Sequence, residues 1–249
     1  AKTPIMVILF GQIKVLLGSL HGYAMQSWSD YFSMRDWLKN YLSSQEGRKV
    51  LEVIEKDEKQ YAHYPMIPDR YNAYNIKQSD IKVVLSDVYP DVRQPRFDNG
   101  YAWSNTQNIW TKKGDTLRYQ IERDFQQQIT MPYKFDFSNW TQQGVFMPHQ
   151  HLTIRWRAEI AHPQHYWDNL YWAALKYLVL TEEPKVFIIV GKDPGHLRTK
   201  ELKELNRKNY KHLILHGLEV GALDRRLNYF YSSHTFLRSK DIEPINWVL

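Results

Sequence analysis

The sequence has no cysteine among its 249 residues. This absence excludes disulfide bonds, thiolate metal sites and cysteine nucleophiles, and it fits a reducing compartment: the cytoplasm of a bacterial host or the nucleus of a eukaryote. The chain also lacks the roughly 18 consecutive apolar residues that a membrane span requires, because Gln12 and Lys14 interrupt the apolar stretch from Pro4 to Leu20. We expect that stretch to pack as a strand or helix, and the protein to have no membrane partner.

Internal repeats, low-complexity tracts and an interdomain linker are also absent, so we expect one domain over residues 1–249, with residues 1–26 as an amino-terminal extension. Hydrophobic residues make up 43% of the chain and charged residues 24%, which is typical of a globular protein. The formal net charge of +6 is compatible with a polyanionic partner such as DNA. We expect the protein to be a monomer.

Short apolar segments alternate along the chain with segments of helical periodicity. The helical segments cover residues 27–60, 167–180 and 194–209, and the apolar segments cover residues 81–85, 144–147, 186–190 and 212–215. Buried strands that alternate with helices predict an α/β fold, a three-layer αβα sandwich with a four-stranded, mainly parallel central sheet. In such sheets the functional residues follow the carboxyl ends of the strands.

The loops after these four strands carry distinctive motifs. In chain order they are Leu85-Ser-Asp-Val-Tyr-Pro90, Pro148-His-Gln-His-Leu-Thr-Ile-Arg155, Gly191-Lys192 and His216-Gly-Leu-Glu-Val-Gly-Ala-Leu223. With the aromatic stretch Gly100-Tyr-Ala-Trp-Ser104, they resemble the loops of family-1 uracil-DNA glycosylases in order and spacing, over residues 27–249. The resemblance implies that family's fold, base flipping, and duplex or single-stranded DNA as the partner.

The resemblance gives the first loops catalytic and base-binding roles. With one residue deleted, Asp87 matches the family's water-activating aspartate, and Tyr89 matches the tyrosine that screens C5 of the base; an ungapped match brings in Asp91 instead. Trp103 stands where the family stacks an aromatic ring on the flipped base. His149 stands where an asparagine recognises the pyrimidine.

The segment from His212 to Arg226 resembles the family's DNA-intercalation loop. Leu223 matches the leucine that fills the space vacated by the flipped base, an apolar wedge of the kind that kinking proteins use. Arg225 and Arg226 are suited to hold the adjacent phosphates. The resemblance adds three further DNA-contacting positions: Pro65, Pro68 and Lys192.

Two departures from the family change the chemistry. A neutral imidazole offers one donor and one acceptor, so His149 cannot reproduce the paired groups of an asparagine amide, and selectivity for uracil should weaken. Glu219 stands where the family has its catalytic histidine, and an ionised carboxylate repels the negative charge that develops on a pyrimidine oxygen. Glu219 is therefore protonated, paired with Arg225 or His216, a proton acceptor for a nucleophile, a recognition group for a cationic or hydroxylated substituent, or a loop carboxylate without chemistry.

The other candidate residues also have purely structural interpretations. Asp87 has the sequence context of a helix N-cap or turn residue as well as that of a general base or a carboxylate that stabilises a cationic sugar. Trp103 suits a core position, and Leu223 suits a buried loop anchor. The His-x-His spacing of His149 and His151 is a weak metal signal without further ligands, so we expect neither a metal nor a cofactor.

Three functions fit this pattern. The first is a DNA glycosylase that hydrolyses the N-glycosidic bond of a modified pyrimidine, such as a hydroxymethylated one. The second is a transferase that modifies an activated 5-hydroxymethylpyrimidine, as in bacteriophage DNA hypermodification, with a small-molecule amine as donor and Glu219 as its base. The third is a catalytically silent, glycosylase-like DNA-binding subunit.

Overall fold

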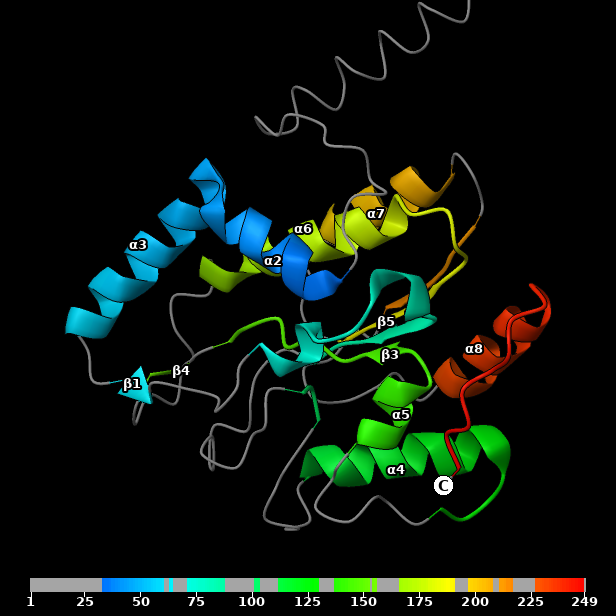
Figure 1. The fold of residues 1–249 in the computed structure, drawn as a ribbon. Helices are drawn as coiled ribbons and strands as arrows, with labels where there is room; N and C mark the ends of the chain where they lie inside the picture. Colours follow the sequence, from blue (N-terminus) through cyan, green and yellow to red (C-terminus); the bar gives the residue numbers. More distant parts are fainter. Residues whose placement is uncertain are drawn as a thin grey trace, which may run out of the picture.

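A computed structural model describes residues 33–60, 63–64, 71–87, 101–103, 112–129, 137–152, 154–155, 166–190, 197–207, 211–216 and 227–248. A central sheet lies between two groups of helices (Figure 1). The sheet has the order β3-β2-β5-β6, and its strands are Val83–Leu85 (β2), Val145–Phe146 (β3), Val186–Ile189 (β5) and Leu213–His216 (β6). All pairings between these strands are parallel. The predicted α/β sandwich with a four-stranded parallel sheet is therefore confirmed.

The helices form two layers, one on each face of the sheet (Figure 1). One layer contains Met34–Ser43 (α2), Gln45–Gln60 (α3), Tyr166–Val179 (α6) and Leu197–Arg207 (α7). The other contains Lys112–Phe125 (α4), Ser138–Gln142 (α5) and Tyr229–Arg238 (α8). The remaining elements are the 3₁₀ turns Asn72–Tyr74 (η2) and Gln78–Asp80 (η3), and a small antiparallel sheet of His63–Tyr64 (β1) and Ile154–Arg155 (β4).

The central strands separate two hydrophobic cores because successive side chains of a strand point to opposite faces. Val84 and Phe187 pack into the core beneath α2, α3, α6 and α7. Val83 and Ile188, each next to one of these residues in the chain, pack into the core on the side of α4, α5 and α8. All four side chains are fully buried. Strands buried on both faces explain why the sequence shows unbroken apolar runs rather than alternation.

The helix predicted over residues 27–60 is two helices, α2 and α3, that meet at Ser44. Ser44 has extended backbone angles (φ −71°, ψ 166°) and ends α2. Its hydroxyl oxygen accepts the N–H of Gly47, which caps the first turn of α3. A side chain at Gly47 would place a Cβ atom 2.0 Å from the carbonyl oxygen of Tyr41, so only glycine permits this close turn. Residues 27–32 lie outside the described part of the chain.

The other helical and strand predictions agree with the structure to within a few residues at each end. The helix predicted over 167–180 is α6, and the described part of the basic helix predicted over 194–209 is α7. The helices α4 and α8 were not predicted from the sequence. The apolar stretch 4–20 lies outside the described residues. Among the helices that the structure describes, none is long and apolar enough to cross a membrane.

Candidate functional site

Asp87 and His149 lie side by side where β2 and β3 end. The N–H of Asp87 donates to the carbonyl of Pro148 (3.4 Å), and the N–H of Gln150 donates to the carbonyl of Asp87 (2.8 Å), so the parallel pairing continues past the strands. The side chains of Asp87 and His149 are both buried, with 1% of each residue exposed. The structure thus brings together two residues that are 62 positions apart in the chain and that sequence analysis assigned to one site.

Ser86 connects this edge of the sheet to three neighbouring elements. Its hydroxyl accepts a hydrogen bond from the hydroxyl of Tyr171 on α6 (2.8 Å) and from the N–H of Val190 after β5 (3.4 Å). Its N–H donates to the carbonyl of Ile188 (3.1 Å), and its carbonyl accepts the indole N–H of Trp103 (3.2 Å). The N–H, the carbonyl and the hydroxyl of buried Ser86 therefore all form hydrogen bonds. These bonds fix Ser86, the residue directly before Asp87.

Trp103 lies at this edge too, but its ring is part of the core. Only 3% of the residue is exposed, and it packs in the same core as Leu85 and Met147. Its φ of 70° is in the left-handed region, which costs a tryptophan on the order of 1 kcal/mol or more. The N–H of Ala102, which donates to the carbonyl of Met147 (2.8 Å), and the indole bond hold this conformation. Stacking of Trp103 on a base stays a prediction, and it requires the core around the ring to open.

A second polar group holds the loop after β3 against α6. The side-chain amide of Gln150 donates to Asp168 Oδ1 (3.0 Å), and His151 Nε2 lies 3.6 Å from the same oxygen. Gln150 and His151 are buried, with 6% and 5% exposed. Asp168 belongs to the first turn of α6, where a carboxylate also interacts favourably with the helix dipole. His149 is therefore followed by two residues that are held to a rigid helix.

Ser86, Tyr171 and Asp168 were not predicted as site residues from the sequence. The signal for Ser86 was its position directly before Asp87, at the end of the apolar run over residues 81–85. Tyr171 and Asp168 lie on α6. Helical periodicity indicates only which side chains of a helix face the interior, and it does not indicate their hydrogen-bond partners. In the ranges that the structure describes, no three His, Asp or Glu side chains gather as a metal site would need.

Eight of the predicted site residues lie outside the described part of the chain: Pro65, Pro68, Tyr89, Lys192, Glu219, Leu223, Arg225 and Arg226. Except for Pro65 and Pro68, these residues lie in segments that follow a strand which the structure describes. β2, β5 and β6 run parallel, so residues 88–90, 191–196 and 217–226 each begin after a strand that ends at the edge of the sheet where Asp87 lies. The order of the strands is therefore compatible with one site at this edge.

The opposite edge of the sheet holds a buried titratable pair. The N–H of Lys185 donates to His212 Nδ1 (3.1 Å), and His212 Nε2 donates to the carbonyl of Val179 (2.9 Å). The imidazole is therefore the neutral Nε2–H form. Burial, opposed by the Val179 hydrogen bond, lowers the pKa of His212 to about 4. Burial also lowers the pKa of the Lys185 amine, although Glu183 partly offsets this.

No protein-family model matches the sequence. Curated relatives do. A uracil-DNA glycosylase from Lactococcus lactis subsp. cremoris is 27% identical over 224 residues, which cover 85% of this chain and 97% of the relative. A uracil-DNA glycosylase from Dictyostelium discoideum is 29% identical over 233 residues, which cover 88% of this chain and 64% of the relative.

Solved structures show the same fold. A mimivirus UNG variant in complex with UGI matches with a TM-score of 0.66 at 17% identity, covering 86% of this chain and 87% of that one. Mimivirus uracil-DNA glycosylase matches with a TM-score of 0.57 at 17% identity, covering 92% and 95%. Fold and site together define an α/β protein with its candidate site at the carboxyl edge of a parallel sheet. Sequence similarity over most of the chain, together with the shared fold, supports a divergent member of the uracil-DNA glycosylase superfamily.

Proposed function

We propose that this protein is a DNA base-flipping glycosylase that removes a modified pyrimidine by hydrolysing its N-glycosidic bond. The observation that carries the proposal is the pairing of buried Asp87 with His149 at the carboxyl edge of the sheet. These two positions match the water-activating and base-recognising positions of the family, and the relatives are named uracil-DNA glycosylases. We propose that the protein acts as a monomer on duplex or single-stranded DNA.

Asp87 supplies the chemistry in this proposal. The bond between C1′ of the sugar and the base nitrogen breaks, and the base leaves with the electron pair. Water forms the new bond to C1′, and its proton passes to the Asp87 carboxylate or to solvent. Before water adds, the same carboxylate stabilises the cationic sugar. A carboxylate away from bulk water acts more strongly on that charge than an exposed one, because the effective dielectric constant is lower.

His149 sets the choice of base. Its backbone is fixed by pairing with Asp87, and the next two residues are held to Asp168, so its ring has little freedom to adapt. An imidazole in a position suited to an asparagine amide satisfies only part of the hydrogen-bonding edge of uracil. A buried polar group of the substrate that finds no partner lowers the selectivity of the enzyme for that substrate by about a hundredfold or more. A pyrimidine with a different exposed substituent is therefore the proposed substrate.

The residues outside the described ranges complete the proposal from the family resemblance. Tyr89 screens C5 of the base. Trp103, which belongs to the described part of the chain, stacks on the base once the core around its ring opens. Glu219 recognises a cationic or hydroxylated substituent or accepts a proton there. Leu223 fills the vacated stack, and five further residues contact the DNA backbone: Pro65, Pro68, Lys192, Arg225 and Arg226.

The test is mass spectrometry of duplex oligonucleotides that carry uracil, thymine, 5-hydroxymethyluracil, 5-hydroxymethylcytosine or their phosphorylated or glucosylated forms. Loss of one whole base, leaving an abasic site, supports the proposal and names the substrate. The variant Asp87→Asn keeps the side chain's size and should bind DNA without excising the base. It is the matched control.

Two other results would replace this proposal. A gain in mass, or an amine in place of a displaced phosphate, with the glycosidic bond intact and only when a small amine is added, identifies the transferase of DNA hypermodification. Measurable DNA binding without any change in mass identifies a silent DNA-binding subunit. Preference for uracil over every modified base would retain the glycosylase and refute the role given to His149.

A further inference from the structure

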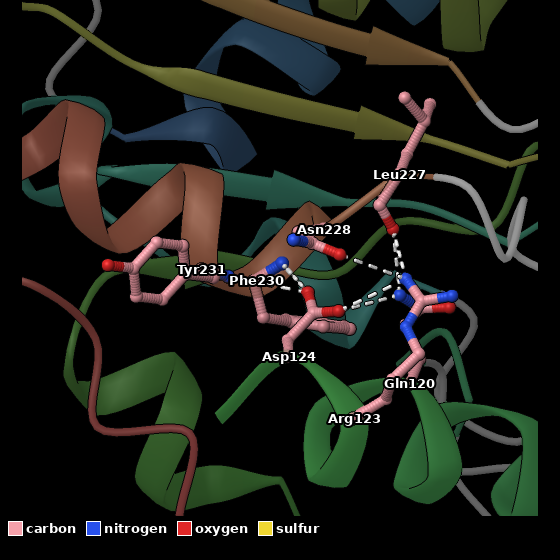
Figure 2. Close-up of polar contacts among 7 residues, drawn as sticks. All are labelled: Gln120, Arg123, Asp124, Leu227, Asn228, Phe230 and Tyr231. Carbon is pink, nitrogen blue, oxygen red and sulfur yellow. Dashed lines mark hydrogen bonds and ion pairs between the residues drawn. The ribbon is translucent and has the colours of Figure 1, made fainter. Parts of the chain in front are cut away.

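Polar side chains of α4 hold the chain at the point where α8 begins (Figure 2). The side-chain amide of Gln120 donates to the carbonyl of Leu227 (2.9 Å), and the guanidinium of Arg123 donates to the same carbonyl. Arg123 also donates to Asn228 Oδ1 (3.4 Å). Two consecutive residues before α8 are therefore bonded to a helix more than a hundred positions earlier in the chain.

Asp124 completes this group from the next position of α4. Its Oδ2 accepts the backbone N–H groups of Phe230 (2.8 Å) and Tyr231 (3.4 Å), which are the second and third residues of α8. Its Oδ1 accepts from Gln120 (2.9 Å) and from Arg123 (3.2 Å). The carboxylate is fully buried, and each of its oxygens is bonded. We call Gln120, Arg123 and Asp124 the α4 clamp.

The clamp replaces the cap that a helix normally builds from its own sequence. Asparagine is among the best N-cap residues because its side chain accepts the N–H of the second or third helical residue. Within the described part of the chain, Asn228 stands at the N-cap of α8 but makes no capping hydrogen bond. Asp124 accepts those two N–H groups instead. A local cap would stabilise α8 alone, whereas a carboxylate from α4 also fixes where α8 starts relative to α4.

Residue 227 is also the end of a functional segment in the proposed mechanism. Residues 217–226, which include Leu223, Arg225 and Arg226, follow β6 and precede Leu227. The β6 end is fixed because His216 pairs with Ile189 of β5. The α4 clamp fixes the Leu227 end.

We infer that the α4 clamp is a positioning device for base flipping: by fixing Leu227, it sets the place from which the Leu223 wedge enters the DNA. This inference rests on the proposed function. Displacement of a catalytic or substrate-positioning group by about 1 Å can reduce a rate by about a hundredfold. Loss of the clamp therefore slows flipping and excision, while phosphate contacts elsewhere keep DNA binding close to normal.

The experiment compares five proteins on the substrate that the oligonucleotide panel identifies, with 2-aminopurine placed beside the target base to report unstacking. Gln120→Met keeps the side chain's length and removes two hydrogen bonds. Asp124→Ala removes the cap but leaves Asn228 able to cap α8 locally, so the helix persists while its attachment to α4 is lost. Asn228→Ala removes the long Arg123–Asn228 hydrogen bond but keeps the bonds of the clamp to Leu227 and Phe230, so it is the matched control. Leu237→Ala, a buried residue at the far end of α8, is a control for lost stability.

The expected result is a fall of about tenfold or more in kcat and in the rate of the 2-aminopurine signal for Gln120→Met and Asp124→Ala. KM should change by about twofold at most, since phosphate contacts dominate DNA affinity. Asn228→Ala and Leu237→Ala should keep kcat near that of the wild type. Hydrogen exchange of peptides covering 217–231 should accelerate only in the two clamp variants.

Two results would overturn the inference, and they are distinguishable. If the clamp variants flip and excise like the wild type, or lose activity only as much as Leu237→Ala at equal stability, the α4 clamp is structural and the proposed function stands. If the wild-type protein itself neither flips nor excises any base in the panel, the proposed function and the inference fail together.

Discussion

Acid should destabilise this protein through His212, at the amino end of β6. The imidazole is 6% exposed, and it uses Nδ1 as an acceptor for the Lys185 N–H and Nε2 as a donor to Val179. Protonation of Nδ1 removes that acceptor and places a positive charge in a buried site. Lys185 and Lys211 make this charge less favourable, and Glu183 opposes them.

The size of the effect follows from the pKa of His212, which burial lowers from 6.5 to about 4. Because the folded state binds the proton less tightly than the unfolded state, the contribution is complete above about pH 6.5 and is lost as the pH falls towards 4. One pKa unit corresponds to about 1.4 kcal/mol, so full protonation costs about 3 kcal/mol. At pH 5 the loss is about 2 kcal/mol, a large part of the stability of an ordinary domain.

The assay is urea denaturation followed by tryptophan fluorescence, on the wild type and on His212→Gln, between pH 8 and pH 4.5. A glutamine amide offers an acceptor and a donor, as the imidazole does, but it does not titrate in this pH range. The stability of the variant therefore depends on pH through every group except the imidazole. The wild type should lose about 2 kcal/mol more than the variant between pH 8 and pH 5. An equal loss in both proteins would refute the reasoning.

Three further substitutions test other parts of the structure. Tyr171→Phe removes the buried hydrogen bond to the Ser86 hydroxyl and should cost about 1 to 2 kcal/mol in urea denaturation; kcat on the identified substrate should also fall, and an unchanged kcat would separate Ser86 from the chemistry. Gly144→Ala should cost at least about 1 kcal/mol, because Gly144 has a φ of +103° and a Cβ atom would lie 2.3 Å from the carbonyl oxygen of Asp80; a neutral result in thermal denaturation would contradict that geometry. Leu223→Ala should slow the 2-aminopurine signal severalfold with little change in the free energy of unfolding, and a large drop in stability would instead identify a buried anchor.

Sequence patterns predicted the central sheet because its strands are buried on both faces. Val186 to Ile189 is wholly buried, so its side chains must all be apolar, and a short apolar run before a glycine reports that condition directly. Asp87 and His149 were assigned to one site by the resemblance to family-1 uracil-DNA glycosylases, and the parallel sheet explains why they meet. The ends of parallel strands meet at one edge, so residues that follow different strands become neighbours.

Contacts between distant segments could not be predicted from the sequence. Ser86 and Tyr171 are 85 positions apart, and neither residue type alone indicates that their hydroxyls meet. The cap on α8 comes from Asp124, 106 positions from Phe230, whereas local rules assign it to Asn228. The break at Ser44 was missed because hydrophobic periodicity continues across it, while a single hydroxyl both ends one helix and starts the next.

The alternation of side chains between two cores also constrains how such a chain can evolve. Val83 and Val84 are neighbours in sequence but belong to different cores. Insertion or deletion of one residue within β2 would send every later side chain of the strand to the wrong core. Length changes are therefore tolerated only between strands, and at the carboxyl edge those intervals are the loops in which the functional residues of such sheets usually lie. A lineage with this sheet can change its loops while the strands keep their lengths, which is consistent with a fold shared at 17% identity.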